Sequence, residues 1–211
     1  ESVGLLDCMD KVETEMKLRG GDQPFASRAE GHLRKAWGFA VGYKNTGFGG
    51  GATDAATADV ELLADGTFEA RTSSAELGQG LSTVLQMIVS EELDVSPTRV
   101  RVLLMDTDLT PDGGATTASR QTYVSGNAVR LAASTLRQAI ISVLAEKIDI
   151  PPDRIRFTED MLQAGEQRIP LATIAAMMNS EGHEPRIRYE YQAPKTNPLG
   201  QGSDTHIAYS F

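Results

Sequence analysis

Cysteine and histidine are scarce in this chain of 211 residues, which holds one cysteine and three histidines. Cys8 has no partner for an internal disulfide, and His32, His183 and His206 lie far apart in the sequence. Zinc and iron–sulfur sites need several Cys or His ligands at close spacing, so the sequence offers a ligand set for neither. A single cysteine is typical of a reducing compartment, and we expect a cytoplasmic protein.

Basic residues are also in short supply, because 20 lysines and arginines face 29 aspartates and glutamates and leave a net charge of −9. A general nucleic-acid-binding protein presents a basic face, so nucleic acid is not expected as a partner. No apolar run approaches membrane-spanning length and no signal peptide opens the chain, so a membrane is not expected either. The composition, 40% hydrophobic and 23% charged, is that of an ordinary globular protein.

The two ends of the chain predict that it is a fragment of a larger protein. It begins with Glu1 rather than Met, and residues 205–211 alternate as in a strand and end on Phe211. A strand at the end of a chain needs a partner strand to pair its backbone groups. We therefore expect more of the protein on either side.

Hydrophobic periodicity predicts an α+β fold in which two long amphipathic helices pack on a mixed or antiparallel sheet layer. These helices are expected over residues 81–93 and 121–148. Shorter helices are predicted over 5–18 and 169–179, and strands over 37–43, 57–63, 67–73, 100–105 and 186–192. We expect residues 1–34 to form an N-terminal helix and linker, and residues 35–211 to form one incomplete domain.

The strands over 57–63 and 67–73 are expected to form a hairpin, because Asp65-Gly66 between them is a strong two-residue turn signal. The first of them alternates cleanly. Its apolar residues, Ala58, Val60 and Leu62, are expected on the buried face, with Asp59 and Glu61 on the other.

Residues 92–102 and 147–157 resemble each other. In each, a helix ends in an acidic–apolar pair, a proline turn follows, and a strand with two arginines begins. Such a repeat favours two helices of one design packed on a shared sheet. Independent convergence explains it equally well, because Pro and Asp are favoured turn residues.

Gly78-Gln79-Gly80 lies between a predicted strand and a predicted helix. Glycine on both sides lets a ligand approach the backbone, and the Gln79 amide offers two donors and an acceptor. A tight turn in which Gln79 caps a neighbouring backbone group is the other interpretation. For so short a motif taken alone, the turn is favoured.

Residues 107–128 run from a turn into a helix start and are rich in hydroxyls, small residues and backbone donors. The first turn of a helix has unpaired N–H groups and a partial positive charge, so it suits a phosphate or a polar cofactor. Candidate ligand groups are Thr116, Thr117, Ala118, Ser119 and Gln121. A simple helix cap explains one hydroxyl but not the whole run, which favours a ligand site.

Other motifs are incomplete. Residues 47–51 are glycine-rich, but no Lys-Ser/Thr and no helix follow, so they are not a P-loop. The sequence has no Gly-x-Ser-x-Gly elbow of a hydrolase. Asp106, Asp108 and Asp112 lack the spacing of a calcium loop, and His206 fits a structural histidine better than a catalyst.

In order along the chain, residues 76–80, 106–114 and 117–128 resemble the molybdopterin-binding region of the xanthine dehydrogenase/aldehyde oxidase family of molybdenum hydroxylases. The resemblance runs from about residue 37 to residue 211 and includes the terminal pattern His-x-Ala-Tyr-x-Phe at 206–211. The block 118–128 is its specific part. Bacterial large subunits of the family look most similar.

The resemblance implies a site for the molybdenum cofactor, with Gln79 on the pterin and the small-residue block along the pterin–pyrophosphate arm. The implied cofactor-binding residues are Gly78, Gln79, Gly80, Thr117, Ala118, Ser119 and Gln121. The cytosine dinucleotide form of the cofactor is expected. Its dithiolene, rather than protein side chains, would bind the metal.

The resemblance also implies the family's reaction, in which oxygen derived from water is inserted at an electron-poor carbon of an aldehyde or N-heterocycle. Electrons would leave through 2Fe-2S clusters and FAD on partner subunits or domains. The other partners are the rest of the molybdopterin-binding subunit and a small-molecule substrate. The family's general base, a glutamate, is expected beyond Phe211, so no catalytic residue is assigned and the fragment alone is expected to be inactive.

Two other classes of function compete with this one. A non-catalytic scaffold or subunit-contact module could keep the fold, although it has no need of Gln79 and Ser119. An unrelated hydrolase or nucleotide-binding domain is disfavoured by the missing elbow and P-loop.

Overall fold

The computed structural model describes residues 4–20, 28–35, 40, 44–45, 47–48, 52–158, 160–195 and 208–209. The α-helices are α1 (Leu5–Gly20), α2 (Leu81–Leu93), α3 (Gly126–Ile148) and α4 (Leu171–Ser180). The strands are β1 (Arg28–Glu30), β2 (Leu33–Lys35), β3 (Lys44–Asn45), β4 (Ala55–Leu62), β5 (Phe68–Thr72), β6 (Val100–Leu104), β7 (Ile155–Thr158), β8 (Met161–Ala164), β9 (Gln167–Pro170), β10 (Arg186–Gln192) and β11 (Ala208–Tyr209). Short helical turns are η1 (Pro97–Arg99), η2 (Gln121–Ser125) and η3 (Pro152–Arg154).

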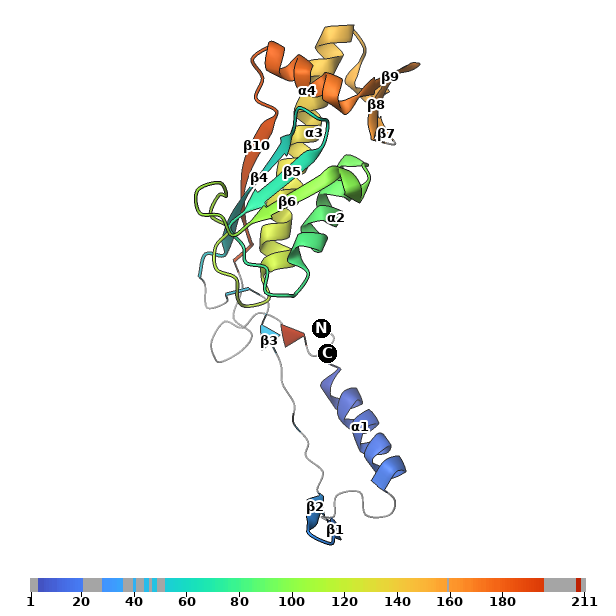
Figure 1. Cartoon of the computed structure of the whole chain (residues 1–211), viewed down its shortest axis with the longest axis vertical. Helices are drawn as coiled ribbons and strands as arrows, with labels where there is room; N and C mark the ends of the chain where they lie inside the picture. Colours follow the sequence, from blue (N-terminus) through green and yellow to red (C-terminus); the bar gives the residue numbers. More distant parts are fainter. Residues whose placement is uncertain are drawn as a thin grey trace.

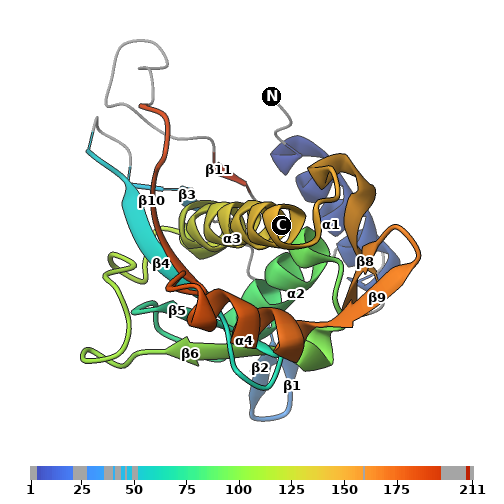
Figure 2. The same cartoon turned by 90° about the horizontal axis from the view of Figure 1, so that it is seen from above.

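A four-stranded sheet with the order β10-β4-β5-β6 forms the centre of the fold. β4 pairs antiparallel with β10 and β5, whereas β5 and β6 are parallel. α2 and α3 cover one face of this sheet (Figure 2). α2 is also the crossover between the parallel strands β5 and β6 (Figure 1). The predicted α+β class, with two long helices on a mixed sheet, is confirmed.

The β4–β5 hairpin forms where the sequence predicts it. Leu63 N donates to Thr67 O at 2.8 Å and Gly66 N donates to Leu63 O at 2.9 Å, so the turn spans three residues, Ala64, Asp65 and Gly66, rather than the two that the sequence predicts. Gly66 has a φ of +82°, and a Cβ there would lie 2.7 Å from the backbone nitrogen of Ala172. Both the turn and the close approach of α4 therefore require glycine.

Apolar side chains of the sheet and both helices form one core. The predicted inward face of β4, Ala58, Val60 and Leu62, is buried. From the helices the core receives Leu81, Leu85, Val89 and Leu93 of α2, and Ala132, Leu136, Ile140 and Leu144 of α3. The apolar stripes of both long helices thus pack where their periodicity predicts.

Asp59 lies on the outer face of β4, opposite the apolar core, but it is not exposed to solvent. Its side chain is fully buried because Arg186 and Arg188 of β10 cover it. Arg188 Nε donates to Asp59 Oδ1 at 2.8 Å, and Arg186 Nε donates to Oδ2 at 3.0 Å. Burial raises the pKa of Asp59, but the hydrogen bonds and charges of Arg188 and Arg186 outweigh it and hold the pKa below its usual value.

The continuous helix over Gln121–Ile148 is the one helix in the described ranges that is long and apolar enough to cross a membrane. This corrects the expectation that no apolar run reaches such a length. The same helix lies against α2, β4 and β10, and Leu136 and Ile140 are fully buried there. The core helix of a globular domain has the same length and composition, so the finding is weak support for a membrane span.

The repeated sequence pattern corresponds to a repeated turn. Asp94 after α2 and Asp149 after α3 both have a φ of +52°, and each is followed by a short turn, η1 or η3. Val95 N donates to Ser90 O at 3.1 Å, and Ile150 N donates to Ala145 O at 3.2 Å. Both helices pack on the shared sheet as expected, but the strands diverge: β6 joins the central sheet and β7 begins the separate sheet β7-β8-β9.

Several elements differ from their predictions. β1 and β2 form a hairpin inside the expected linker, and β8 and β9 lie where the sequence predicts no strand. α4 begins at Leu171 because Ile169 and Pro170 belong to β9. β6, predicted as a buried strand, lies at the edge of the sheet, and of its residues only Val100 is buried.

The N-terminal helix is present as α1, but most of its apolar stripe is exposed: Leu6 is 71% exposed, and Met16 is buried. The predicted strand over 37–43 and the terminal run over 205–211 lie mostly outside the described residues. Within that run, Ala208–Tyr209 forms β11 and pairs with β3. The division of the chain at residue 35 stays a prediction.

Candidate functional site

The two segments predicted to hold a ligand lie side by side at the end of the sheet where β5 leads into α2. Ala75 N donates to Thr116 Oγ1 at 2.7 Å. Beside this bond, Gly113 N donates to Ser73 Oγ at 2.8 Å, and Ser73 N donates to Pro111 O at 2.9 Å. β5 and β6 are parallel and both end here, and α2 and α3 begin here (Figure 1). In α/β folds, ligands commonly bind at the carboxyl ends of the parallel strands.

The Gly78-Gln79-Gly80 turn is exposed and is held by bonds within itself. Gly78 has a φ of +95° and Gly80 a φ of +81°, a region that glycine enters without strain. Gln79 Oε1 accepts from Leu77 N at 2.6 Å, and Gln79 Nε2 donates to Ala75 O at 2.8 Å. The local capping that the sequence left open is therefore present. It uses one of the two amide hydrogens and one of the two oxygen lone pairs of Gln79.

A carboxylate occupies the start of α2. Glu76 opens the resembling block 76–80 but is not among the predicted site residues. It accepts hydrogen bonds from the backbone N–H groups of Ser82, Gly80 and Gly78. These bonds, with that of Ser82 foremost, hold the pKa of Glu76 below its usual value. The positive end of the α2 dipole is thus already matched by a negative side chain.

At the start of the other long helix, the residue at the N-cap position makes no such cap bond in the part of the chain that the structure describes. η2 is a π-type turn that continues directly into α3, with Gly126 N donating to Gln121 O. Arg120, at the N-cap position, makes no side-chain bond to this first turn. First-turn N–H groups have no partner inside a helix and carry partial positive charge. π-type turns are rare and frequently lie at functional sites.

Thr117 and Ser119 stand exposed next to this helix start, whereas Ala118 between them is buried. Ala118 and Ser119 both have a φ of +52°, a strained conformation for residues that carry a Cβ. The Ala118 carbonyl accepts from Gly47 N at 2.8 Å, so Gly47 contacts this loop. Strained residues persist only where their surroundings hold the backbone firmly, and they cluster at functional sites.

Gln121 points into the protein and is only 9% exposed. Its Oε1 accepts from Ser125 Oγ at 3.0 Å, and Ser125 Oγ lies 3.2 Å from Ser74 Oγ. This buried network joins the start of the α3 helix to the residues that follow β5. The seven predicted cofactor-binding residues are therefore gathered at one end of the sheet, with Gln79, Thr117 and Ser119 open to solvent and Gln121 turned inward.

Arg120 holds the small-residue loop in place, and no sequence prediction assigned it a role. Its side chain is fully buried, and its Nε donates to Asp54 Oδ1 at 2.6 Å. Nη1 donates to the carbonyls of Gly113 and Ala115, both at 2.9 Å, and the guanidinium lies 5.1 Å from the ring centre of Phe48. The signal in the sequence is a lone arginine amid small residues, where only its carbonyl and carboxylate partners make a buried cation tolerable.

Residues 11–211 match the family described as "Molybdopterin cofactor-binding domain". The chain belongs to this family. The predicted membership in the molybdopterin-binding part of xanthine dehydrogenase/aldehyde oxidase-type proteins is thereby confirmed.

Relatives of this molybdopterin cofactor-binding domain support the same assignment. The xanthine dehydrogenase molybdenum-binding subunit of Escherichia coli O157:H7 is 33% identical over 144 residues, which are 67% of this chain and 19% of that subunit. Subunit gamma of the 6-hydroxypseudooxynicotine dehydrogenase complex of Paenarthrobacter nicotinovorans is 34% identical over 122 residues, 57% of this chain and 15% of that subunit.

The fold has counterparts among solved structures. Aldehyde oxidoreductase from Desulfovibrio gigas superimposes with a TM-score of 0.64 at 20% identity, over 98% of this chain and 20% of that one. Aldehyde oxidoreductase from Desulfovibrio desulfuricans gives a TM-score of 0.61 at 23% identity, over 95% of this chain and 19% of that one. The chain thus spans about a fifth or less of the length of each of these four proteins.

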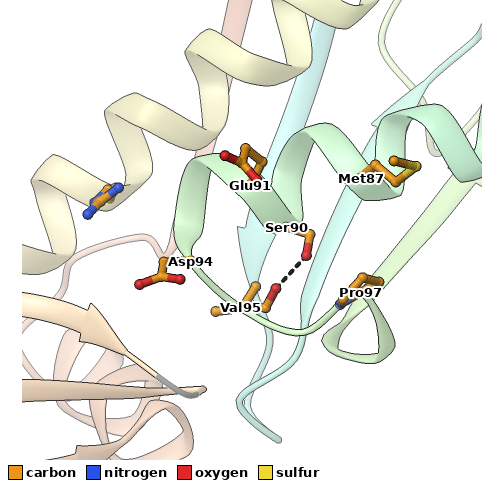
Figure 3. Close-up of a pocket in the computed structure, with 7 residues that line it drawn as sticks. Met87, Ser90, Glu91, Asp94, Val95 and Pro97 are labelled. Carbon is orange, nitrogen blue, oxygen red and sulfur yellow. Dashed lines mark hydrogen bonds between the residues drawn. The ribbon is translucent and has the colours of Figure 1, made fainter.

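Two further features of this molybdopterin cofactor-binding domain lie apart from the predicted site. In the part of the chain that the structure describes, no group of three or more His, Cys, Asp or Glu side chains is placed to hold a metal ion. A hollow of about 490 Å³ lies at the far end of α2 (Figure 3). Its lining residues are Met87, Ser90, Glu91, Asp94, Val95, Pro97 and Arg137. None of them is a predicted cofactor-binding residue, and Ser90 closes the helix end by bonding to Val95 O (Figure 3).

Proposed function

We propose that this domain holds the pterin and the anionic arm of a molybdenum cofactor inside the larger molybdopterin-binding subunit of a hydroxylase. The observation that carries the proposal is the bond from Ala75 N to Thr116 Oγ1, because it places the Gly78-Gln79-Gly80 turn beside the small-residue loop. One ligand can therefore contact both. The match to the molybdopterin cofactor-binding family supports the same ligand.

The residues present fit the polar, negatively charged arm of such a cofactor. Thr117 and Ser119 offer exposed hydroxyls, and the N–H groups at the helix start receive no bond from the side chain at the N-cap position. The side chains of Thr117 and Ser119 are short, which lets a ligand approach the exposed part of the loop closely. Phosphate groups bind readily at helix starts of this kind.

Charge favours one orientation of the cofactor. The carboxylate of Glu76 lies at the start of α2 and repels a phosphate there. The anionic arm is therefore expected along Thr117 and Ser119, at the start of η2 and α3. Gln79 then faces the pterin, whose amide-like edge can use the remaining donor and acceptor of its side chain.

When bound, the cofactor supplies redox-active molybdenum through its own dithiolene sulfurs. The chain's own residues bind and orient it, and no catalytic residue is proposed among them. The reaction we propose for the whole protein inserts water-derived oxygen at an electron-poor carbon of an aldehyde or N-heterocycle. The cytosine dinucleotide form, 2Fe-2S and FAD on partner subunits or domains, and a cytoplasmic location belong to the same proposal. Two relatives are named as subunits, one of them of a dehydrogenase complex, which supports a multi-subunit protein.

Replacing Gln79 tests the proposal in the whole subunit. Gln79→Ala removes the side-chain amide from an exposed turn, so folding is expected to be unaffected while molybdenum content per subunit falls roughly five-fold, as for the loss of one hydrogen bond. Gln138→Ala, an exposed glutamine of α3, is the matched control and is expected to leave the content unchanged. Unchanged molybdenum and cytidine nucleotide in the Gln79→Ala subunit would reject the assignment. No cofactor even in the unmodified subunit would favour the scaffold.

A further inference from the structure

Glu76 binds both glycines of the turn and the first turn of α2 through a single carboxylate. Its Oε1 accepts from Gly78 N at 2.9 Å and from Gly80 N at 3.1 Å. Its Oε2 accepts from Ser82 N at 3.0 Å. Gln79 therefore lies between two backbone amides that the same side chain fixes.

This carboxylate replaces a cap that the local sequence does not provide. Gly80 stands at the N-cap position of α2 and has no side chain to bond the first-turn amides. Ser, Thr, Asp or Asn normally supplies that bond. Glu76 supplies it from four residues upstream, and its negative charge interacts favourably with the helix start.

The direction of the Gln79 side chain depends on this arrangement. Gly78 and Gly80 have φ values of +95° and +81°. Without other contacts, two glycines would let the backbone of this turn adopt many conformations. Three bonds to one carboxylate select a single conformation out of that range. Both bonds that the Gln79 amide makes, to Leu77 N and Ala75 O, lie inside the turn so selected.

We propose that Glu76 is a positioning residue that keeps the Gly78-Gln79-Gly80 turn in the shape in which Gln79 meets the cofactor. This rests on the proposed function, because it concerns the same site. Glu76 acts through Gln79 and needs no contact with the ligand. Its carboxylate faces three backbone amides of its own chain.

The side-chain series at position 76 predicts a graded response. Glu76→Gln keeps one acceptor oxygen for Gly78 and Gly80, but it turns an NH₂ group, which cannot accept, toward Ser82 N. Glu76→Ala removes every acceptor. Molybdenum content in the whole subunit is expected to fall roughly five-fold for Glu76→Ala, and by less for Glu76→Gln. Glu91→Ala, an exposed carboxylate of the same helix, is the matched control and is expected to change nothing.

A double-mutant cycle distinguishes positioning from a general loss of structure. If Glu76 acts through Gln79, the subunit with both Glu76→Ala and Gln79→Ala retains as much molybdenum as Gln79→Ala alone. If the double variant instead lost molybdenum by the product of the two single-variant factors, Glu76 would act independently of Gln79, and the inference would be overturned. So would normal molybdenum in Glu76→Ala when Gln79→Ala is depleted. Normal molybdenum in Gln79→Ala would instead reject the proposed function itself, so the two failures are separable.

Discussion

The two halves of the site are held by opposite kinds of contact. The loop over residues 113–121 is fixed from a distance: Arg120 reaches Asp54 across 66 residues of sequence, and Gly113 reaches Ser73 across 40. In the turn around Gln79, the side-chain bonds of Glu76 and Gln79 all reach six residues or fewer. The first half is held around the buried side chain of Arg120, whereas the residues of the second half, 77–80, are exposed.

This difference in contacts predicts that the two halves differ in how readily they open. Contacts between distant segments form only when the whole fold forms, whereas a turn closed on itself can open alone at small cost. We therefore expect the loop over 113–121 to be rigid and to bind the anionic arm of the ligand without rearranging. The side-chain bonds that hold the turn around Gln79 lie within the turn itself, so the turn is expected to open locally more often than the loop does.

Breaking the rigid half has the largest expected effect. Arg120→Met keeps most of the side-chain volume but leaves the buried Asp54 carboxylate without its cation, and it removes the Arg120 donors from the carbonyls of Gly113 and Ala115. Removing one member of a buried ion pair typically costs about 3–5 kcal/mol. Urea unfolding of the subunit is the measurement, and molybdenum content is expected to fall with stability.

Two controls sharpen the result for Arg120. Arg120→Lys keeps the charge but not the planar fork that reaches several oxygens, so an intermediate loss is expected. Glu146→Ala, on the exposed side of α3, is expected to change the free energy of unfolding by no more than about 0.5 kcal/mol. A loss below about 1 kcal/mol for Arg120→Met would show that other contacts hold the loop.

The ion pairs of Asp59 provide a long-range contact away from the site. Asp59→Asn is expected to lower the free energy of unfolding by about 1.5–3 kcal/mol at pH 7, the worth of hydrogen bonds to a charged group. Molybdenum content per folded subunit is expected to stay constant. An unchanged free energy of unfolding, or a loss of molybdenum without a loss of stability, would contradict the view that Asp59 and its two arginines only stabilise the sheet.

The same residue predicts a pH dependence. The two arginines lower the pKa of Asp59 in the folded state despite its burial, so its contribution is present above the unfolded pKa of about 3.9 and is lost as pH falls through the lower folded pKa. The difference in stability between unmodified protein and Asp59→Asn is therefore expected to shrink in acid below about pH 4. Urea unfolding at a series of pH values measures it.

The sequence predicts the parts of the fold that depend on local patterns. The α2 and α3 stripes, the hairpin at Asp65-Gly66 and the β10 span over 186–192 all follow from periodicity and turn chemistry. β8 and β9 escape prediction because they are only four residues each, too short for alternation to stand out. The edge position of β6 escapes as well, since strand order depends on pairing between distant segments.

The site divides in the same way. The sequence finds the Gly78-Gln79-Gly80 turn and the exposed hydroxyls of Thr117 and Ser119, because their residue types reveal an open, polar loop. It misses Arg120 and Glu76, whose roles depend on which distant or neighbouring backbone groups they meet. Gln121 shows the converse: its residue type suits a ligand, but the folded chain turns it toward Ser125. Whether it meets the cofactor stays a prediction.

The smallest expected effect tests the bond that joins the two halves. Thr116→Val keeps the shape of the side chain and removes the oxygen that accepts Ala75 N–H, a change worth about 1 kcal/mol. Hydrogen exchange of the subunit is expected to speed up roughly five-fold at Leu77 and Gly78 and to stay constant at Val124, whose amide bonds to Arg120 O. Thr83→Val, exposed on α2, is the matched control. Equal acceleration at Val124 would mean that both halves open as one unit, and the contrast between a rigid loop and a turn that opens alone would then be wrong.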